Sequence, residues 1–545
     1  MKISLSMLMA TLLSLATTIP AGEVSTIPHL EKHGTTMQLM VDDKPFLILG
    51  GELHNSSSSS VDYMKPFWPG LAALHLNTVL TPVSWELIEP KEGKFDFTLV
   101  DGLIHGAREN HLHLVFLWFG SWKNSMSCYA PAWVKTNEAR FPRAETRDGK
   151  GMEILSPFSP ANRDADAHAF AALMRHIREV DGQKHTVIMV QVENEIGMIP
   201  EARDHSPVAN KMFDEPVPPE LMDYLEQHKD TLTPEVRTTW EDAGFKGSGT
   251  WQEVFGPGQA AEEIFMAWYF ARYTDAVAAA GKAEYPLPMY VNAALIRANF
   301  KPGQYPSAGP LPHLMDLWRA GAPQIDFLSP DIYFPNFAEW CERYHRPGNP
   351  VFVPEARPIM ANAFYAFGQC NALGFSPFGV EDEIPHPGKN GLPPLAKTYA
   401  VLTPLSPLIL KNRGEGTMAG VWVDESNHTE TVHLGNYTLT VAHDYTWPYS
   451  SGYHETNTWP RFGGLIISTG PNEYFIAGEG IIVTFKPNPP GDPIAGIASI
   501  DEGTFVNGRW VAGRRLNGDE DHQGRHLRLP PGQFGIQRVR LYRYH

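Results

Sequence analysis

VIMVQVENEIG (residues 187–197) is a run of apolar and β-branched residues that ends in two carboxylates, Glu193 and Glu195, on either side of Asn194. Continuous apolar runs are typical of strands in parallel sheets that are covered on both faces. In a parallel barrel, catalytic residues lie at the C-terminal ends of such strands. The stretch therefore predicts a buried strand that carries acids to a functional site. A strand that simply runs out into solvent is the structural alternative.

Residues 45–379 repeat this pattern, with short apolar strands separated by longer segments of helical periodicity such as 98–110 and 163–180. Alternating strands and helices indicate a parallel sheet, and eight such pairs predict an α/β fold, the (β/α)8 TIM barrel. A doubly wound open sheet is the alternative, but it would need a glycine-rich phosphate turn that the sequence lacks. The strands are expected at residues 45–53, 77–85, 112–120, 187–195, 286–294, 324–333, 350–356 and 372–379.

Changes in pattern along the chain predict the domain organisation. We expect the barrel to span 28–413, closed by a helix over 395–412, with an insertion at about 200–258 after the fourth strand. An insertion at that point either shapes access to the mouth of the barrel or is decorative. Residues 414–545 alternate apolar and polar residues between Gly, Pro and Asn turns, which predicts a C-terminal all-β, sandwich-like domain.

Composition excludes several classes of partner. The formal net charge is -17 and no block of Lys and Arg forms a phosphate-binding stripe, so we expect no nucleic acid partner. The three cysteines are too few for a disulfide scaffold, and Cys341 and Cys370 form either one bridge or two buried thiols. No cluster of His and Cys indicates a metal, and no cofactor is expected. The oligomeric state is left open.

The first residues indicate that the protein is exported from the cytoplasm. One Lys precedes an apolar segment from about Leu5 to Ala16, and small residues follow up to Ala21. This pattern is typical of a secretory signal peptide over 1–21 and predicts a periplasmic or secreted protein. The apolar run is too short for a membrane span, although an uncleaved anchor is the alternative. No later segment is apolar enough to cross a bilayer, so the mature chain is expected to have no membrane span.

A second carboxylate, Glu355, ends the seventh strand as Glu195 ends the fourth. These strand ends face one another across the mouth of a closed barrel, and opposed carboxyl groups are the machinery of glycoside hydrolysis. One acid must stay protonated to donate to the leaving oxygen while the other stays ionised to attack. An ion pair between Glu355 and Arg357 is the structural alternative. Strand alternation places Glu193 and Glu195 on one side and Asn194 on the other, unless a bulge intervenes.

These motifs resemble those of a known family. QVENEIG is similar to the QxENExG signature of glycoside hydrolase family 35 β-galactosidases, and GGELHNS and NTVLTPVSWELIEPKEGKFDF resemble that family's first and second strand segments. The resemblance covers most of the barrel. It implies a retaining enzyme with Glu195 as acid/base and Glu355 as nucleophile, while Glu193 becomes a structural or supporting carboxylate. It also suggests a bacterial branch with its own C-terminal β domain, some members of which act on galactose side chains of xyloglucan.

The loop after the third strand departs from the family pattern, because Ser121 stands where an acid is common. Recognition of the sugar's hydroxyl groups is therefore expected to differ in part. A terminal β-galactoside is the first expectation, and a β-glucosidase, an endo-glucanase or a non-catalytic carbohydrate-binding protein are the alternatives. Other side chains near strand ends are candidates for binding the carbohydrate substrate through hydrogen bonds or stacking. They are Asn194, Tyr333, Trp85, Trp118, Trp122, Asn124, Glu52 and His54.

Overall fold

The computed structural model describes residues 26–385, 391–450, 452–453 and 458–545. The signal peptide expected over 1–21 lies outside these residues. Eight parallel strands close into a barrel, because the last strand pairs with the first. The (β/α)8 prediction is confirmed and the open-sheet alternative is wrong. The strands, in order, are β4 (Ile48–Glu52), β5 (Thr78–Ser84), β6 (His113–Lys123), β9 (Val187–Asn194), β10 (Met289–Ala294), β11 (Phe327–Ile332), β12 (Val353–Ala356) and β13 (Gly374–Pro377).

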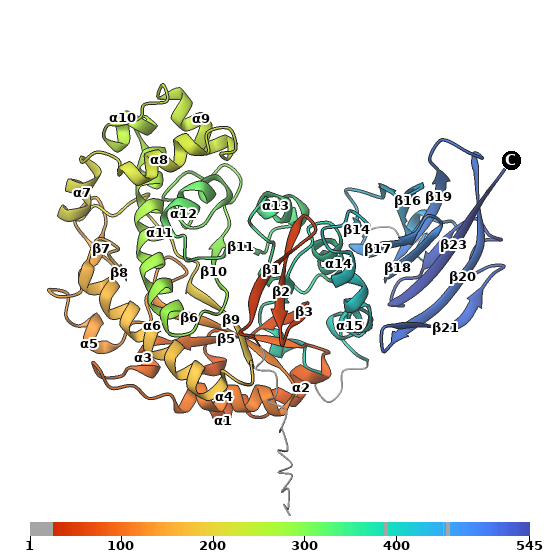
Figure 1. Ribbon diagram of the computed structural model, residues 1–545, viewed down its shortest axis with the longest axis horizontal. Coiled ribbons are helices and arrows are strands. Elements are labelled where there is room, and N and C mark those ends of the chain that lie inside the picture. The colour runs from red at the N-terminus through yellow and green to blue at the C-terminus, as the bar shows by residue number, and fades with distance from the viewer. Residues whose placement is uncertain (1–25, 386–390, 451, 454–457) are drawn as a thin grey trace, which may run out of the picture.

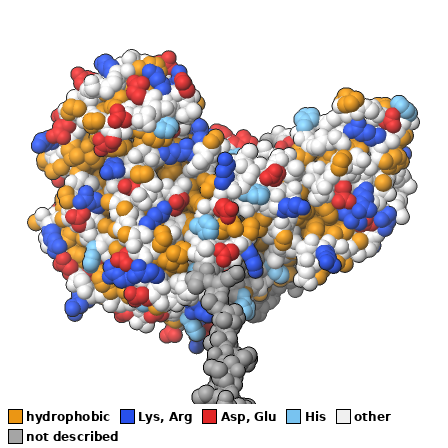
Figure 2. Space-filling model, viewed as in Figure 1, with side chains coloured by type: hydrophobic (Ala, Val, Ile, Leu, Met, Phe, Trp, Pro, Cys, Tyr) orange, Lys and Arg blue, Asp and Glu red, His pale blue; other side chains and the backbone are white. Residues whose placement is uncertain are grey.

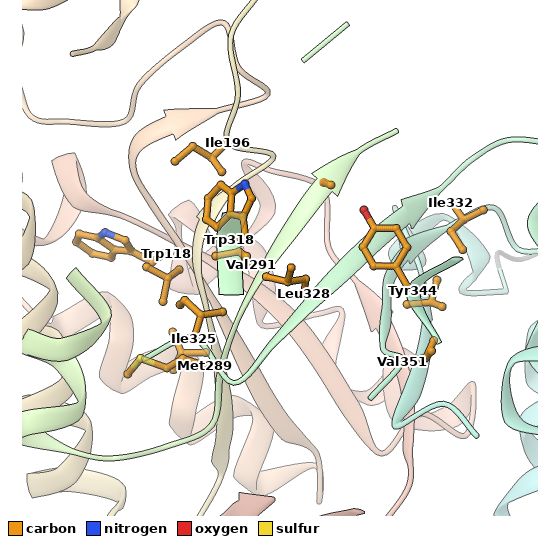
Figure 3. Packing of buried hydrophobic residues seen from close by; sticks show 14 of the residues in the cluster. Trp118, Ile196, Met289, Val291, Trp318, Ile325, Leu328, Ile332, Tyr344 and Val351 are labelled. Carbon is orange, nitrogen blue, oxygen red and sulfur yellow. The ribbon is translucent and has the colours of Figure 1, made fainter. Parts of the chain in front are cut away.

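Strand alternation divides the apolar residues between two cores. On β6, Leu117 and Phe119 fill the barrel interior, whereas Phe116 and Trp118 face the helices outside. Each large apolar side chain removed from water stabilises the fold by about 1.5–3 kcal/mol. Both faces of the strands are therefore apolar, which explains the continuous runs in the sequence. Figure 3 shows the outer core around β10 and β11, with Trp118, Ile196, Met289, Val291, Trp318, Ile325 and Leu328 among its members.

The helices that cover the barrel follow the predicted order. Helix α4 (Thr98–Glu109) follows Phe97, and the Thr98 N–H at its start donates to the Asp96 carboxylate. Helix α6 (Pro160–Asp181) is capped by Ser159, which accepts from the Asn162 N–H. The remaining barrel helices are α1 (Val61–Met64), α2 (Trp68–Ala73), α3 (Trp85–Ile88), α5 (Ala132–Lys135), α11 (Gln259–Glu284), α12 (Met315–Gly321), α13 (Phe337–Tyr344), α14 (Met360–Gly368) and α15 (Pro394–Asn412).

The insertion after β9 folds as four short helices that pack on the outside of the barrel (Figure 1). The Thr233 N–H donates to the Asp316 carboxylate on α12 over 2.6 Å, and Glu235 pairs with Arg343 on α13. These contacts fix the insertion to the outer helices; its expected role in substrate access stays a prediction. The helices are α7 (Pro207–Phe213), α8 (Pro219–Gln227), α9 (Pro234–Asp242) and α10 (Trp251–Phe255).

Two small sheets were not anticipated from the sequence. The first joins β1 (His29–His33), β2 (Thr36–Val41) and β3 (Lys44–Phe46), and its Leu39 and Val41 fill the barrel core. The second is the hairpin of β7 (Arg143–Glu145) and β8 (Gly151–Leu155). Because Leu39 and Val41 pack beneath the inner barrel residues, the segment before the barrel is part of its core.

The C-terminal region is a sandwich of two antiparallel sheets that share one apolar core, as predicted. Strand β21 (Arg509–Leu516) reads RWVAGRRL and is mostly exposed, so it shows little of the alternation on which the sandwich prediction rests. One sheet has the order β14 (Met418–Val423), β17 (Phe462–Gly470), β18 (Glu473–Glu479), β23 (Gly535–Tyr544), β20 (Ile494–Val506) and β21 (Arg509–Leu516). The other has the order β15 (Thr429–Leu434), β16 (Tyr437–His443), β19 (Ile481–Pro487) and β22 (Leu527–Leu529).

The outer face of the six-stranded sheet packs on α14 of the barrel (Figure 1). A Cβ added to Gly368 would lie 2.4 Å from the Gly420 backbone nitrogen, so only glycine permits this close approach of helix and strand. The Arg461 guanidinium also donates to Asn362 on α14. The sandwich is thereby held against the side of the barrel near β11 and β12.

Two further predictions concern the cysteines and membrane spans. The structure has three buried free thiols, Cys128, Cys341 and Cys370. Cys341 and Cys370 are therefore not joined by the disulfide bridge that was one of their two alternatives. Among the described residues, no helix combines the length and apolar character needed to span a bilayer.

Candidate active site

Three carboxyl groups meet at the C-terminal mouth of the barrel. Glu195 follows β9, Asp331 lies on β11 and Glu355 lies on β12, and one oxygen of each lies within 4.8 Å of the others. All three residues are buried. The convergence of Glu195 and Glu355 from the fourth and seventh barrel strands follows the sequence prediction.

The backbone at the end of β9 differs from the expected alternation. Glu193 and Glu195 have φ of 63° and 44°, in the left-handed region, and the register with β6 shifts between Trp118 and Lys123. Asn194 and Glu195 consequently both point into the mouth, whereas Glu193 points outward to the helices. Glu193 and Glu195 therefore do not share a side: the exception stated with the prediction, a bulge at this strand end, applies. Left-handed conformations of non-glycine residues cost about 1–3 kcal/mol each and cluster at functional sites.

Glu355 is held by two hydrogen-bond donors. The Tyr333 hydroxyl donates to one carboxylate oxygen over 2.6 Å, and the Asn194 amide lies 3.5 Å from the other. Donors to a carboxylate favour its ionised form. Burial and the Glu355 charge raise the pKa of Tyr333, so its proton stays on the phenol. The ion pair to Arg357 considered above is not formed, because Arg357 is exposed and lines a neighbouring cleft.

Glu195 lies in an environment that favours its protonated form. Burial, followed by the nearby Glu355 charge, raises the pKa of Glu195 to about 7. The Asn124 amide donates to the Glu195 carboxyl group over 2.6 Å and partly opposes this rise in pKa. The backbone N–H of Glu195 donates to the Asn292 side chain over 2.8 Å and fixes its position. One carboxyl group protonated beside one ionised is the division of labour that glycoside hydrolysis requires.

Four residues of the mouth were missed by sequence reasoning. Asp331 accepts from Asn292 over 2.7 Å, and burial together with the Glu355 and Glu195 charges raises its pKa well above the usual value. Lys123, which donates to Asn124, is the cation whose charge lowers the pKa values of Glu52, Glu195 and Asp331. Tyr290 is buried below the acids. Asp331 could have been found, because SPDIY ends the sixth strand with an acid as VPEA ends the seventh.

Glu52 joins this cluster at the end of β4. Burial first, and then the charge of Glu355, raises its pKa well above the usual value. Apart from the neighbouring Glu355 carboxyl group, neither carboxyl oxygen of Glu52 has a hydrogen-bond partner among the described residues. Buried polar atoms are normally paired, so this group and the equally unpaired Oδ1 of Asn194 fit a site that awaits the hydroxyl groups of a ligand.

The three tryptophans expected to stack on sugar are buried in the outer core. Trp85 donates to Glu89, Trp118 donates to Asp166 and packs on Phe170, and Trp122 packs edge-on against Tyr273. Each is fully buried, so the structure corrects the expectation that they bind substrate. Side-chain alternation on β6 and its shifted register explain why Trp118 and Trp122 face the helices, whereas Trp85 begins helix α3.

Ser121 also faces outward, so its role as a determinant of sugar recognition is corrected. Its hydroxyl contacts Asp166 and the Tyr273 hydroxyl behind the barrel wall. His54 lies at the rim, where its half-exposed ring hydrogen-bonds to Asp382 over 3.0 Å and packs edge-on against Phe378. Of the predicted binding residues, the structure thus brings Asn194, Tyr333, Asn124 and Glu52 to the acids.

Glu193 belongs to a second buried carboxyl pair with Asp166. The pKa of Glu193 is raised by burial and by the Asp166 charge, while Asp166 accepts from Trp118, Ser121 and Tyr273. The Trp122 N–H donates to Oε2 of Glu193 over 2.9 Å. A Cβ at Gly120 would lie 2.7 Å from Glu193, so this pair requires glycine on β6. Glu193 therefore orients the loop that carries Lys123 and Asn124.

The spacing of Glu195, Asp331 and Glu355 is also one that could bridge a divalent cation, since all three offer oxygen ligands. Donors from Tyr333 and Asn124 already engage two of the three groups. The same geometry suits one carboxyl group that donates a proton to a leaving oxygen and one that attacks the anomeric carbon.

The fold and the site first define a class, a (β/α)8 barrel with opposed carboxyl groups on its fourth and seventh strands, the arrangement of glycoside hydrolases. The glycoside hydrolase 42 family model, described as "Beta-galactosidase", matches residues 70–356, more than half of the chain, and the chain belongs to this family. The β-galactosidase resemblance is confirmed at this level, but the match is to family 42, and the expected assignment to family 35 is not confirmed. Residues 395–528 match a "Domain of unknown function (DUF5597)".

Individual relatives are more distant. A "Beta-galactosidase" of Xanthomonas manihotis is 31% identical over 211 residues, which is 36% of this chain and 31% of that protein. The chain thus spans about a third of the length of this curated relative. The β-galactosidase structure from Rahnella sp. R3 has a TM-score of 0.44 and 16% identity, over 67% of this chain and 57% of that one. The one from Bacillus circulans sp. alkalophilus has a TM-score of 0.46 and 14% identity, over 68% and 58%.

Proposed function

We propose that the chain is a retaining glycosidase that removes terminal β-linked galactose from oligo- or polysaccharides, using water and no cofactor. The observation that carries the proposal is the approach of Glu195 and Glu355 to within 4.8 Å, with Tyr333 donating to Glu355. Retaining enzymes have carboxyl groups about 5–5.5 Å apart, and inverting enzymes about 6.5–9.5 Å. The short approach supports retention.

The reaction proceeds in two displacements. Glu355 attacks the anomeric carbon, and the bond from that carbon to the leaving oxygen breaks as Glu195 transfers its proton to that oxygen. Esterification removes the charge of Glu355, which lowers the pKa of Glu195 and prepares it as a base. Glu195 then takes a proton from water, the water oxygen attacks the same carbon, and the ester bond to Glu355 breaks. Both carboxyl groups return to their starting states.

The galactoside is favoured by the family description and by the QVENEIG motif, which resembles family 35. Ser121 faces away from the mouth, so the replacement of the family's usual acid by serine at this position is no argument against galactose as the substrate sugar. Galactose side chains of xyloglucan are the polysaccharide substrate we propose. A periplasmic or secreted location, from the signal peptide expected over 1–21, would give access to such a polymer.

A panel of nitrophenyl β-glycosides tests the proposal. We expect the galactoside to be hydrolysed with a kcat/KM at least about tenfold above those of the glucoside and xyloside, a difference on the order of 1.4 kcal/mol. Proton NMR of the early product should show the β-anomer, since two inversions restore the configuration. A preference for the glucoside would support the β-glucosidase alternative. Complete inactivity of the folded protein on all of these substrates would support a non-catalytic binding protein.

A further inference from the structure

A cleft of about 880 Å³ opens beside the candidate nucleophile, between the barrel and the sandwich. Tyr333, which donates to Glu355, forms part of its lining, so the cleft adjoins the reacting groups. The volume lies within the range of about 300–1,000 Å³ usual for ligand sites. Figure 2 shows the surface notched between these two parts of the molecule. Besides Tyr333, its lining includes Phe334, Asn336 and Arg357 from the barrel and Trp422, Trp459 and Arg461 from the sandwich.

The two tryptophans of the cleft are held in place by neighbours. The Arg461 guanidinium lies over the Trp422 ring at 4.1 Å from its centroid, and His428 stacks on Trp459 at 3.8 Å between centroids. Both rings are only partly buried and both border the cleft. Rings with one covered face and a fixed orientation suit stacking on the C–H face of a sugar at small entropic cost. They differ in this from Trp85, Trp118 and Trp122, which are fully buried.

The charges of the cleft indicate a neutral ligand. Asp424 neutralises Arg461 through a 2.8 Å ion pair, and Glu339 and Glu425 add two carboxylates. The Arg357 guanidinium makes no hydrogen bond or ion pair with any residue that the structure describes. One free cation among several acids does not form an anion site, but its five N–H donors can serve hydroxyl groups. Aromatic rings with scattered donors and acceptors match a neutral polyhydroxylated chain.

We propose that this cleft binds the leaving-group side of the substrate, a neutral oligosaccharide of two or more sugar units that carries the terminal galactose. The inference rests on the proposed function and deepens it: the sandwich, through Trp422 and Trp459, selects galactosylated oligosaccharides over galactosides with small aglycones. A second hollow of about 600 Å³, lined by Phe300 and Trp340, lies across Phe334 and Asn336. This hollow is the alternative place for the leaving-group sugars, but no residue of the sandwich lines it.

The test compares kcat/KM for nitrophenyl β-galactoside and for a galactosylated xyloglucan oligosaccharide in Trp422→Ala and Trp459→Ala variants. We expect the oligosaccharide value to fall at least ~10-fold further than the nitrophenyl value, which corresponds to a lost binding free energy of ~1.4 kcal/mol. Trp510→Ala, a partly buried tryptophan of the same sandwich outside the cleft, is the matched control and should leave the ratio of the two values at its wild-type level. Equal loss on both substrates, or a larger effect of Phe300→Ala on the ratio, would overturn the proposal.

Direct binding separates this inference from the proposed activity. Calorimetry with the xyloglucan oligosaccharide that lacks galactose needs no turnover, and we expect Trp459→Ala to weaken its binding by about tenfold or more. If the wild-type protein binds this probe at least about tenfold more tightly than Trp459→Ala but hydrolyses no galactoside, the proposed function fails and the cleft stands only as an oligosaccharide-binding site. If galactosides are hydrolysed and the probe binds wild type and Trp459→Ala equally, or binds neither, the cleft assignment fails alone.

Discussion

Two buried carboxyl pairs lie on opposite faces of the same strand end, and they differ in how fully the protein satisfies them. Asp166 and Glu193, outside the barrel, receive donors from Trp118, Ser121, Tyr273 and the Trp122 backbone. Glu195 and Glu355, inside the mouth, lie among groups without partners, including both oxygens of Glu52 and one of Asp331. In the outer pair one oxygen, Oε1 of Glu193 beside the Asp166 carboxyl group, has no donor among the described residues, whereas the inner cluster leaves several oxygens for the hydroxyl groups of a substrate.

This difference separates structural acids from functional ones more sharply than the pKa does. Burial raises the pKa of Glu193 and of Glu195 alike. Only Glu195 has a partner, Glu355, whose charge can change during a reaction. We therefore expect substitutions in the inner pair to change chemistry and substitutions in the outer pair to change stability.

The largest effect should come from Glu355→Ala. Loss of a nucleophile typically lowers kcat by about 10⁴-fold or more, because the covalent intermediate cannot form. Azide should restore part of the turnover and give a glycosyl azide of inverted configuration, detectable by NMR. Glu193→Ala is the matched control in the outer pair, and azide should not increase its rate. Near wild-type turnover of the Glu355→Ala variant would remove the nucleophile assignment.

Glu195→Gln should lower kcat/KM by about 10²–10⁴-fold for a poor leaving group, because proton donation is lost. In the wild type the acid form is present below the pKa of about 7, so activity should fall as the pH rises through 7. The variant should lack this alkaline limb. For Glu193→Gln the limb should remain near pH 7. The check is kcat/KM from pH 5 to 9, and an unshifted limb in Glu195→Gln would assign the proton to another group.

Tyr333→Phe should reduce kcat/KM by roughly 10- to 100-fold, since a hydrogen bond to a charged group contributes about 1.5–3 kcal/mol. The fold should be unaffected, because Tyr333 is only partly buried. Steady-state kinetics with nitrophenyl galactoside and a thermal melt check both statements. Substitution of Tyr285, a buried tyrosine remote from Glu355, by Phe provides the control. Equal kinetics in the two variants would contradict a role for Tyr333 at the nucleophile.

Asp166→Ala should have the smallest effect on chemistry and a clear effect on stability. It leaves the Trp118, Ser121 and Tyr273 donors without their acceptor, which costs about 2–4 kcal/mol of unfolding free energy. Urea unfolding at pH 7 measures the loss. We expect kcat/KM per folded molecule to stay within about tenfold of the wild type. A loss of activity as large as that of Glu195→Gln, with unchanged stability, would place the outer pair in the catalytic machinery.

The sequence predicted the positions of the candidate catalytic acids in the fold but not those of the aromatic residues. The apolar runs before Glu195 and Glu355 placed both acids, because strand order in a closed barrel sets which strand ends face each other. The aromatic residues could not be placed in this way. Trp118 and Trp122 lie next to the site in sequence but turn outward, while Trp422 and Trp459 lie beside the cleft although they are distant in sequence. Asp331 was overlooked, although its strand ended in the same pattern.

The sequence by itself determined the barrel, the sandwich and the two candidate catalytic glutamates, because local periodicity and strand order carry that information. Only the tertiary structure decided which side of β9 each acid occupies, since the left-handed conformations of Glu193 and Glu195 override simple alternation. It also decided that the sandwich contributes to the cleft beside Tyr333, since that depends on the packing of β14 on α14. Contacts between distant segments arise from packing and leave no periodic signal in the chain.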